Sequence, residues 1–203
     1  PEFAGDGKET VTVRQLLTHT SGLRPDISLK PDWNGTEAAL RLAFAEKLTS
    51  RPGEKFVYSD TGPLLLGEVV RRVSGQPLDR FLAQEVYAPL RMIDTGFNPP
   101  ATQRSRVAPT EIENGQPVRG IVHDPRARRM EGVAGHAGLF TTAADLARFC
   151  RMMLNEGELD GARIFRPETV RAMTRLQTPP HVTAGRGLGW DLNSNYAGQR
   201  GAV

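Results

Sequence analysis

The chain has 203 residues, of which 38% are apolar and 24% are charged, a balance typical of a globular protein with a substantial core. Its net charge of +3 is small, and Arg126, Arg128 and Arg129 lack the interleaved aromatic residues of a nucleic-acid surface, so we interpret them as a solvated loop. A single cysteine excludes an intrachain disulfide, and no apolar run approaches the ~20 residues of a membrane span.

The first predicted helix begins at Thr12, which stands three residues before Gln15 in the spacing of a capping box. Gly22 is expected to cap its C-terminus. His19 falls at this helix end, where a histidine stabilises the last carbonyls and the helix dipole, so we assign it a structural role.

Five further helices are predicted from apolar residues at helical spacing, most of them behind a proline or a capping residue, and they cover residues 36–48, 63–73, 77–87, 142–155 and 167–176. A short extended segment at 55–58 follows the turn at Pro52 and Gly53. The glycine- and proline-rich region 92–138 predicts loops with a few brief strands, and 185–190 resembles the start of a strand. Cys150 follows the helical spacing of its apolar neighbours, so we interpret it as buried packing rather than a nucleophile.

The chain contains no repeats and no low-complexity linker, so one helix-rich unit over residues 1–203 is the simplest organisation. No signal peptide is visible. The start at Pro1 instead of methionine is consistent with a removed targeting segment or with an artificial boundary.

The four histidines are candidates for metal binding or catalysis. None of His19, His123, His136 and His181 pairs with another at the i,i+4 spacing of a helical zinc site, so we expect no metal. His136 is flanked by glycines in GVAGHAGLF, which let a backbone approach a ligand closely but also serve ordinary turns. The chain has no G-x-S-x-G elbow, phosphate loop or dinucleotide fingerprint, so no cofactor is indicated.

The tripeptide Tyr58-Ser59-Asp60 links the extended segment to the next predicted helix. Taken alone it favours a half-buried tyrosine that hydrogen-bonds through its hydroxyl. Three longer phrases change this interpretation: VTVRQLLTHTSGL, FVYSDTGPLLLGEVVRRVSGQPLDRFLAQEVYAPLRMIDTGF and GLFTTAADLARFCRMMLNEG. Together, in this order, they resemble the serine β-lactamase and penicillin-binding protein family, and are most similar to its class C branch, which includes D-alanyl-D-alanine carboxypeptidases and esterases.

The resemblance implies that Tyr58-Ser59-Asp60 occupies the second motif of the family, which is usually Tyr-x-Asn. Our catalytic candidates are therefore Tyr58, as the proton-transfer group, and Asp60, which would contact the substrate amide. Ser59, as scaffolding of this motif, and His136, in a glycine-rich loop lining the site, are the candidates for substrate binding. Asp60 departs from the usual asparagine, and because a carboxylate only accepts hydrogen bonds, it would disfavour acidic substrates or pair with a cation.

The other two family motifs do not occur in this sequence. The family acylates a serine in Ser-x-x-Lys and uses Lys-Thr-Gly or His-x-Gly as a third motif. The chain contains neither Ser-x-x-Lys nor Lys-Thr-Gly, and His136-Ala137-Gly138 precedes the phrase that normally comes before the third motif. The resemblance thus implies an internal fragment, with the nucleophile upstream of Pro1 and the third motif beyond Val203. Without the lysine of the first motif, we expect Tyr58 to remain an ordinary phenol with a pKa of about 10, and this fragment to be inactive.

The implied fold is α+β and helix-rich: the helical lobe of a β-lactamase/transpeptidase-like fold, with a few short strands and the central sheet largely missing. The implied function is a fragment of a serine hydrolase that acts on a β-lactam, a D-Ala-D-Ala peptide or an ester, in a periplasmic or extracytoplasmic location. We expect no nucleic-acid partner, and self-association through uncovered apolar surface. The alternative is a non-catalytic module that binds a peptide or glycan, which the absent nucleophile motif favours for the chain as given.

Overall fold

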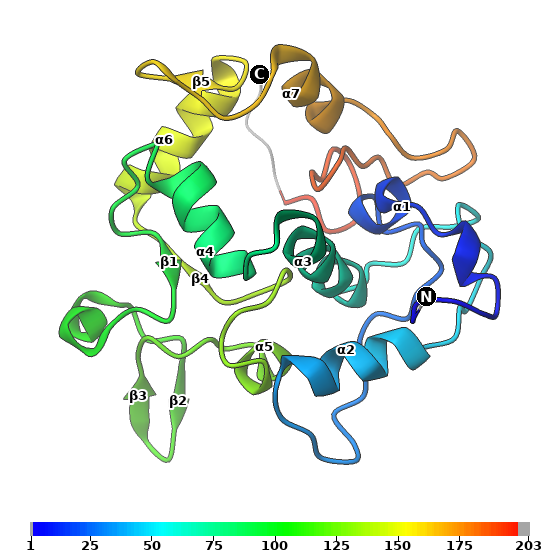
Figure 1. Cartoon of the computed structure of the whole chain (residues 1–203), viewed down its shortest axis with the longest axis horizontal. Coiled ribbons are helices and arrows are strands. Elements are labelled where there is room, and N and C mark those ends of the chain that lie inside the picture. Colours follow the sequence, from blue (N-terminus) through cyan, green and yellow to red (C-terminus); the bar gives the residue numbers. More distant parts are fainter. Residues whose placement is uncertain (1, 199–203) are drawn as a thin grey trace.

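The computed structural model describes residues 2–198 and is dominated by helices (Figure 1). The α-helices are α1 Val13–Leu17, α2 Thr36–Ala45, α3 Thr61–Ser74, α4 Leu78–Leu82, α5 Pro125–Arg129, α6 Ala143–Leu154 and α7 Pro167–Thr174. A π-helical turn, Ala83–Tyr87, continues α4, and 3-10 turns cover Lys8–Thr10 and Ala101–Arg106.

The strands are short and form three antiparallel pairs. They are β1 Gly96–Phe97 with β4 Leu139–Phe140, β2 Glu111–Glu113 with β3 Gln116–Val118, and β5 Glu158–Leu159 with β6 Ala162–Arg163. Within residues 2–198 no sheet has more than two strands, which confirms the prediction of a helix-rich fold with a few short strands. None of the helices in this range combines the length and the apolar character needed to cross a bilayer.

Two helices begin where local capping signals predicted them. The Thr12 side chain accepts a hydrogen bond from the backbone N–H of Gln15 and Gln15 reciprocates, so the capping box of α1 is confirmed. Thr142 caps α6 in the same way through the N–H of Asp145. The prediction that Gly22 ends α1 is wrong: α1 ends at Leu17, and His19 takes a left-handed conformation with φ of 56°.

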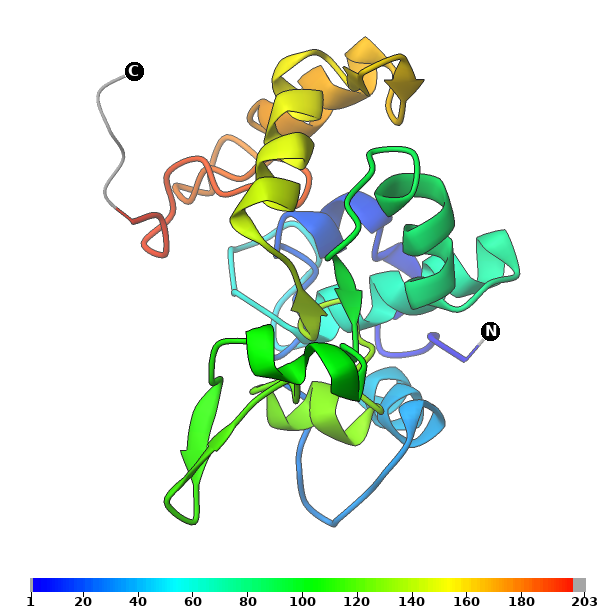
Figure 2. The ribbon, with the colours of Figure 1, turned by 90° about the vertical axis from the view of Figure 1, so that its left-hand side faces the viewer.

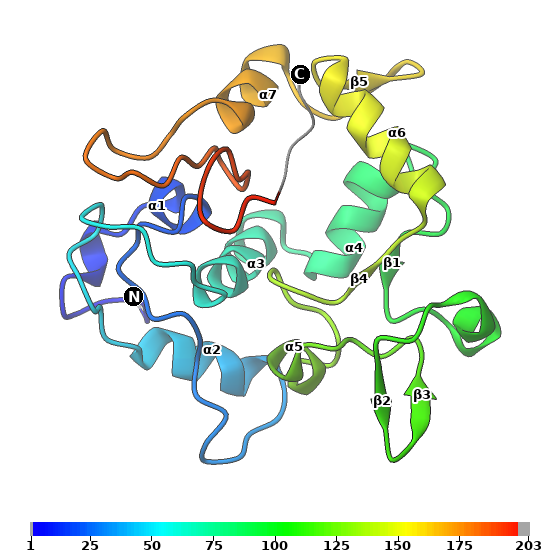
Figure 3. The same cartoon turned by 180° about the vertical axis from the view of Figure 1, so that it is seen from behind.

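Two clusters of buried apolar side chains support these helices. The first joins α1, α2, α3 and α5 and includes Leu16, Leu23, Ile27, Leu40 and Leu64. The second joins the turn after α4 to α6 and α7, and includes Leu90, Met92, Met152, Leu159 and Val170. Figures 2 and 3 accordingly show α3 at the centre, with α2 and α5 on one side and α6 and α7 on the other.

The loop that precedes β4 packs closely against the backbone of α3. A Cβ added to Gly135 would lie 2.0 Å from the carbonyl oxygen of Pro63 in the first turn of α3. A side chain at this position would therefore push the loop away from α3.

The arginine segment and the strand predicted at 185–190 also differ from the sequence predictions. Arg126, Arg128 and Arg129 form a helix rather than a loop, because Asp124 caps α5 and Pro125 occupies its first turn. Their side chains make ion pairs, such as that of Arg128 with Glu111. The predicted strand at 185–190 is reduced to an isolated bridge between residues 186 and 191.

Cys150 is exposed, so its prediction as buried packing is wrong. The packed face of α6 instead carries Met152 and Met153. On the outer face, Leu146 and Leu154 are 49% and 86% exposed, at i,i+4 spacing on either side of Cys150.

Candidate active site

The Tyr-Ser-Asp tripeptide is held in place by the segment that follows α1. The backbone N–H of Val57 donates to the carbonyl of His19 at 2.9 Å, and that of Ser59 donates to His19 Nδ1 at 3.2 Å. Ser59 is buried and its Oγ donates to the carbonyl of Arg24 at 2.6 Å. The N–H of Asp60 donates to the carbonyl of Pro25 at 2.7 Å. Tyr58 is thus positioned by a hydrogen-bonded backbone on both sides.

The Tyr58 side chain lies at the surface of a cavity. It is 39% exposed, and its ring stacks on His19 at a centroid distance of 4.5 Å and lies 4.9 Å from the ring of Tyr196. The adjoining cavity has a volume of about 660 Å³. Its lining includes Pro25, Phe56, Tyr58, His181, Asn193 and Tyr196. A ligand in this cavity would therefore reach the phenol.

The environment of Tyr58 makes its phenol a weaker acid. Partial burial raises its pKa above the usual 10.0, the Asp60 carboxylate adds to this rise, and the Arg186 cation opposes it. The prediction that Tyr58 remains an ordinary phenol is therefore corrected: its hydroxyl holds its proton more tightly than a free tyrosine does.

His19 has a structural role, but not through the helix dipole. Burial, reinforced by the positive charge of Arg186, lowers its pKa from 6.5 to about 4, so the ring is neutral at pH 7. Because Nδ1 accepts the Ser59 N–H, the ring proton lies on Nε2. A neutral ring cannot stabilise a helix dipole by charge, so that part of the prediction is wrong; His19 instead supports the tripeptide and stacks on Tyr58.

Arg186 lies over the ring of Phe56, which precedes Tyr58 by two residues, and sequence reasoning missed it. It is only 6% exposed, its Nη1 lies 2.8 Å from Asp191 Oδ2, and its guanidinium lies 5.9 Å from the centre of the Phe56 ring. The one available signal was its place between two glycines in GRGLGWDLN, and this does not distinguish a site residue from a turn residue.

Asp60 lies at the N-cap of α3 and is half-buried, with no capping hydrogen bond from its side chain in the described part of the chain. Burial raises its pKa; the carboxylates of Asp26 and Asp124 reinforce this rise, whereas His136 and Arg126 oppose it.

His136 lies on the Asp60 side of the tripeptide and not in the lining of the Tyr58 cavity. Its side chain is 1% exposed, and Nε2 lies 3.0 Å from Asp124 Oδ1. Although burial opposes it, the hydrogen bonds from His136 and from the first turn of α5 lower the pKa of Asp124 to about 2. His136 therefore contacts Asp124 directly and acts on Asp60 electrostatically.

The remaining histidines stand apart from one another. His123 lies 3.4 Å from Glu111, and His181 contacts the backbone carbonyl of Gly53 at the rim of the Tyr58 cavity. In the range 2–198, no three His, Cys, Asp or Glu side chains are grouped so as to hold a metal ion.

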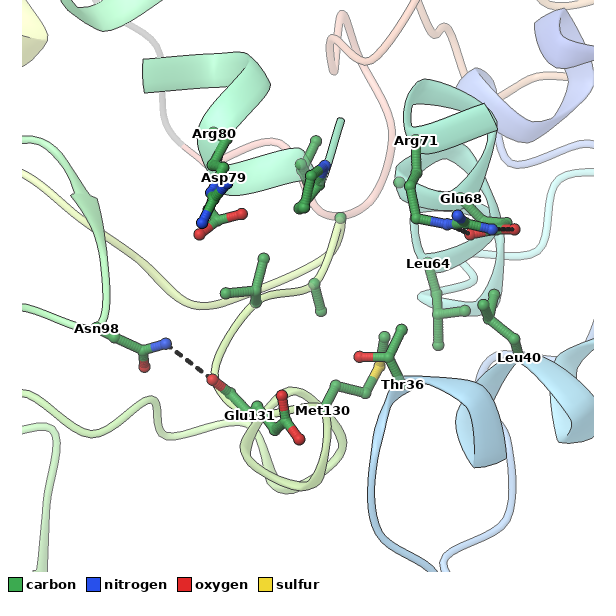
Figure 4. Close-up of a pocket in the computed structure, with 16 residues that line it drawn as sticks. Thr36, Leu40, Leu64, Glu68, Arg71, Asp79, Arg80, Asn98, Met130 and Glu131 are labelled. Atoms are coloured by element: carbon green, nitrogen blue, oxygen red, sulfur yellow. Dashed lines mark hydrogen bonds and ion pairs between the residues drawn. The ribbon is translucent and has the colours of Figure 1, made fainter. Parts of the chain in front are cut away.

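A separate cavity of about 610 Å³ lies between α2, α3 and α4 (Figure 4). Leu40, Leu64 and Met130 line it, and the ion pair of Glu68 with Arg71 lies at its edge. None of Tyr58, Ser59, Asp60 and His136 lines this cavity, so it does not belong to the candidate site.

Comparisons with known proteins identify the family. The family model described as Beta-lactamase matches residues 1–202. A protein of Escherichia coli K12, named provisionally a D-alanyl-D-alanine carboxypeptidase, is 34% identical over 217 residues, which cover 93% of this chain and 48% of that protein. The chain thus spans about half the length of the curated relatives it matches.

Solved structures agree with the sequence comparisons. A penicillin-binding protein homologue from Caulobacter crescentus superposes with a TM-score of 0.73 at 25% identity, over 97% of this chain and 58% of that one. A family VIII carboxylesterase superposes with a TM-score of 0.72 at 26% identity, over 96% and 58%. The fold described above and the match along nearly the whole sequence lead to one conclusion: the chain belongs to the β-lactamase family.

Proposed function

We propose that this chain is part of a serine hydrolase that works through an acyl-enzyme, and that Tyr58 is its proton-transfer group. The observation that carries this proposal is the partly exposed Tyr58 side chain at a cavity, in a tripeptide that resembles the family's second motif. The names of the relatives, a carboxypeptidase for D-alanyl-D-alanine and a carboxylesterase, support a D-Ala-D-Ala peptide or a small ester as the substrate class, and the name of the family adds a β-lactam.

The nucleophile in this proposal lies outside the 203 residues, because the chain contains no Ser-x-x-Lys. Tyr58 then takes the proton of the attacking hydroxyl and passes a proton to the leaving group. A phenol with a raised pKa is a poor base by itself, so the proposal requires a cation supplied by the rest of the protein. The 203-residue chain alone is therefore expected to be inactive.

The test compares this chain with the full-length protein encoded by its gene, each incubated with a reactive penicillin and weighed by intact mass. We expect one penicilloyl adduct on the full-length protein and none on the 203-residue chain. In the full-length protein, Tyr58→Phe is expected to slow acylation by roughly 10²–10⁴-fold, the usual contribution of general acid–base catalysis.

Tyr87→Phe is the matched control, because it removes a phenol hydroxyl from a ring in the second apolar cluster, away from the residues that line the cavity. It is expected to acylate at close to the wild-type rate. An adduct on the 203-residue chain, or equal acylation rates for Tyr58→Phe and the wild type, would overturn the proposal. Reversible binding without any adduct on the full-length protein would instead support a non-catalytic binding module.

A further inference from the structure

A buried cation lies beside the stack of aromatic rings that contains Tyr58. Arg186 comes from the loop after α7, and its guanidinium lies 5.9 Å from the Phe56 ring, two residues before Tyr58. The same charge acts on His19 and on Tyr58, which stack on each other at 4.5 Å. One side chain thus applies a positive potential to both rings.

One of the hydrogen-bond donors of the Arg186 guanidinium has no partner in the part of the chain that the structure describes. Its Nη1 pairs with Asp191, and its Nε is buried with no hydrogen-bond partner among residues 2–198. Buried donors in native proteins are nearly always paired, and an unpaired one in a functional region calls for a reason beyond packing. A neutral residue would hold the turn between 186 and 191 without this cost, because backbone pairing already bridges the two positions.

We propose that Arg186 is a positioning residue for Tyr58: its buried guanidinium lies over the Phe56 ring and places a positive charge beside the stacked rings of His19 and Tyr58. This inference rests on the proton-transfer role proposed for Tyr58, and it adds a residue that the family's three motifs do not contain. Arg186 acts through the field at the phenol and does not itself touch the reacting atoms.

Other charged and titratable groups also face Tyr58. Asp60 and Tyr196 both raise the proton affinity of the phenol, against Arg186. Asp191 reduces the net charge that Arg186 presents, because it pairs with the guanidinium. Three further titratable groups line the same cavity: Glu54, Lys55 and His181. Substituting Arg186 removes a positive charge near the phenol and substituting Asp191 removes a negative one, so the two substitutions are expected to shift the titration of Tyr58 in opposite directions.

The experiment is an NMR titration of the chain with ¹³C-labelled tyrosine ζ-carbons, with the Tyr58 signal assigned from Tyr58→Phe. An opposite charge nearby usually moves a pKa by one to three units, and the Asp191 carboxylate offsets part of the Arg186 charge. We therefore expect Arg186→Gln to raise the titration midpoint of Tyr58 by roughly 0.5 to 1 pH unit. Asp191→Asn is expected to lower it, because the Arg186 cation then stands without its counter-charge.

Three internal checks separate this effect from a change in structure. The His19 midpoint, followed by its ring proton signal, is expected to move in the same direction as that of Tyr58 in each variant, since Arg186 lowers it and Asp191 raises it. Arg186→Lys keeps the charge and is expected to restore a midpoint near the wild type. Tyr87, whose pKa of about 12 results from burial, is expected not to move.

Circular dichroism at each pH identifies a variant that loses its fold. If Arg186→Gln does not fold, Asp191→Asn and Arg186→Lys still decide the question, because the proposal predicts a lowered midpoint for the first and an unchanged one for the second. Unchanged midpoints of Tyr58 and His19 in folded Asp191→Asn would overturn the inference. The result does not depend on acylation, so a failed penicillin experiment and a failed titration have separate meanings.

Discussion

The neutral, buried His19 ring is expected to make this protein sensitive to mild acid. In the folded chain its pKa is about 4, against 6.5 for an unperturbed histidine. Between these two values the unfolded chain binds more protons than the folded one, so the free energy of unfolding falls as the pH drops from 6.5 towards 4. The test therefore lowers the pH through this window and compares the free energy of unfolding of the wild type with that of a variant that lacks the imidazole.

The depressed pKa also gives the size of the effect. Each pKa unit corresponds to about 1.4 kcal/mol, so the full difference between 6.5 and about 4 has an upper limit of about 3 kcal/mol. Between pH 7 and pH 4.5, linkage gives a loss of about 2 kcal/mol from His19. The depressed pKa of Asp124, about 2, acts mainly below this window, because its stabilisation is lost only as the pH falls below the usual 3.8.

The assay is urea unfolding at pH 7, 6, 5 and 4.5 for the wild type and for His19→Asn. Asparagine tolerates the left-handed conformation that His19 adopts, and it does not titrate. The variant is expected to be less stable at pH 7, because it loses the stack on Tyr58, and to lose about 2 kcal/mol less than the wild type on acidification. The two proteins differ only at this residue, so parallel stability curves would refute the reasoning.

Two further predictions follow from packing. Gly135→Ala is expected to lower the free energy of unfolding by about 1–3 kcal/mol, because its Cβ would lie 2.0 Å from the Pro63 carbonyl oxygen. Gly96→Ala is the matched control, because a Cβ there meets nothing within 4 Å. Equal urea midpoints for the two variants would contradict this prediction. The exposed Leu146 and Leu154 are expected to promote self-association, which L146K/L154K should reduce in size-exclusion chromatography with light scattering. A wild-type chain that is already monomeric would count against the second prediction.

The parts of the fold that the sequence predicted are those set by local rules. The capping residues Thr12 and Thr142 act on N–H groups three positions away, so their helices could be recognised directly. Cys150 shows the limit of such patterns. Its spacing fits an apolar stripe, but the core lies on the side of Met152 and Met153, and only tertiary structure decides which stripe of a helix is buried.

The electrostatics of the candidate site could not be predicted in the same way. Tyr58 and Asp60 were found from a motif, yet the causes of their pKa shifts include Arg186, Asp26 and Asp124, which come from distant parts of the sequence. His19 was misjudged for the same reason: the residues that bury it and keep it neutral do not belong to its own helix. Burial and charge are properties of the assembled chain, and periodicity does not report them.

The hydrogen bonds of Ser59 also bear on the order in which the molecule assembles. They join residues 40 and 35 positions apart, His19 and Arg24 respectively, whereas α1 and α3 form through contacts within a few residues. Closing a loop of this length costs entropy that only later packing repays. Tyr58 is therefore expected to take its final orientation only when residues 19–24 pack beside it, and a peptide cut from residues 53–63 is expected not to reproduce it.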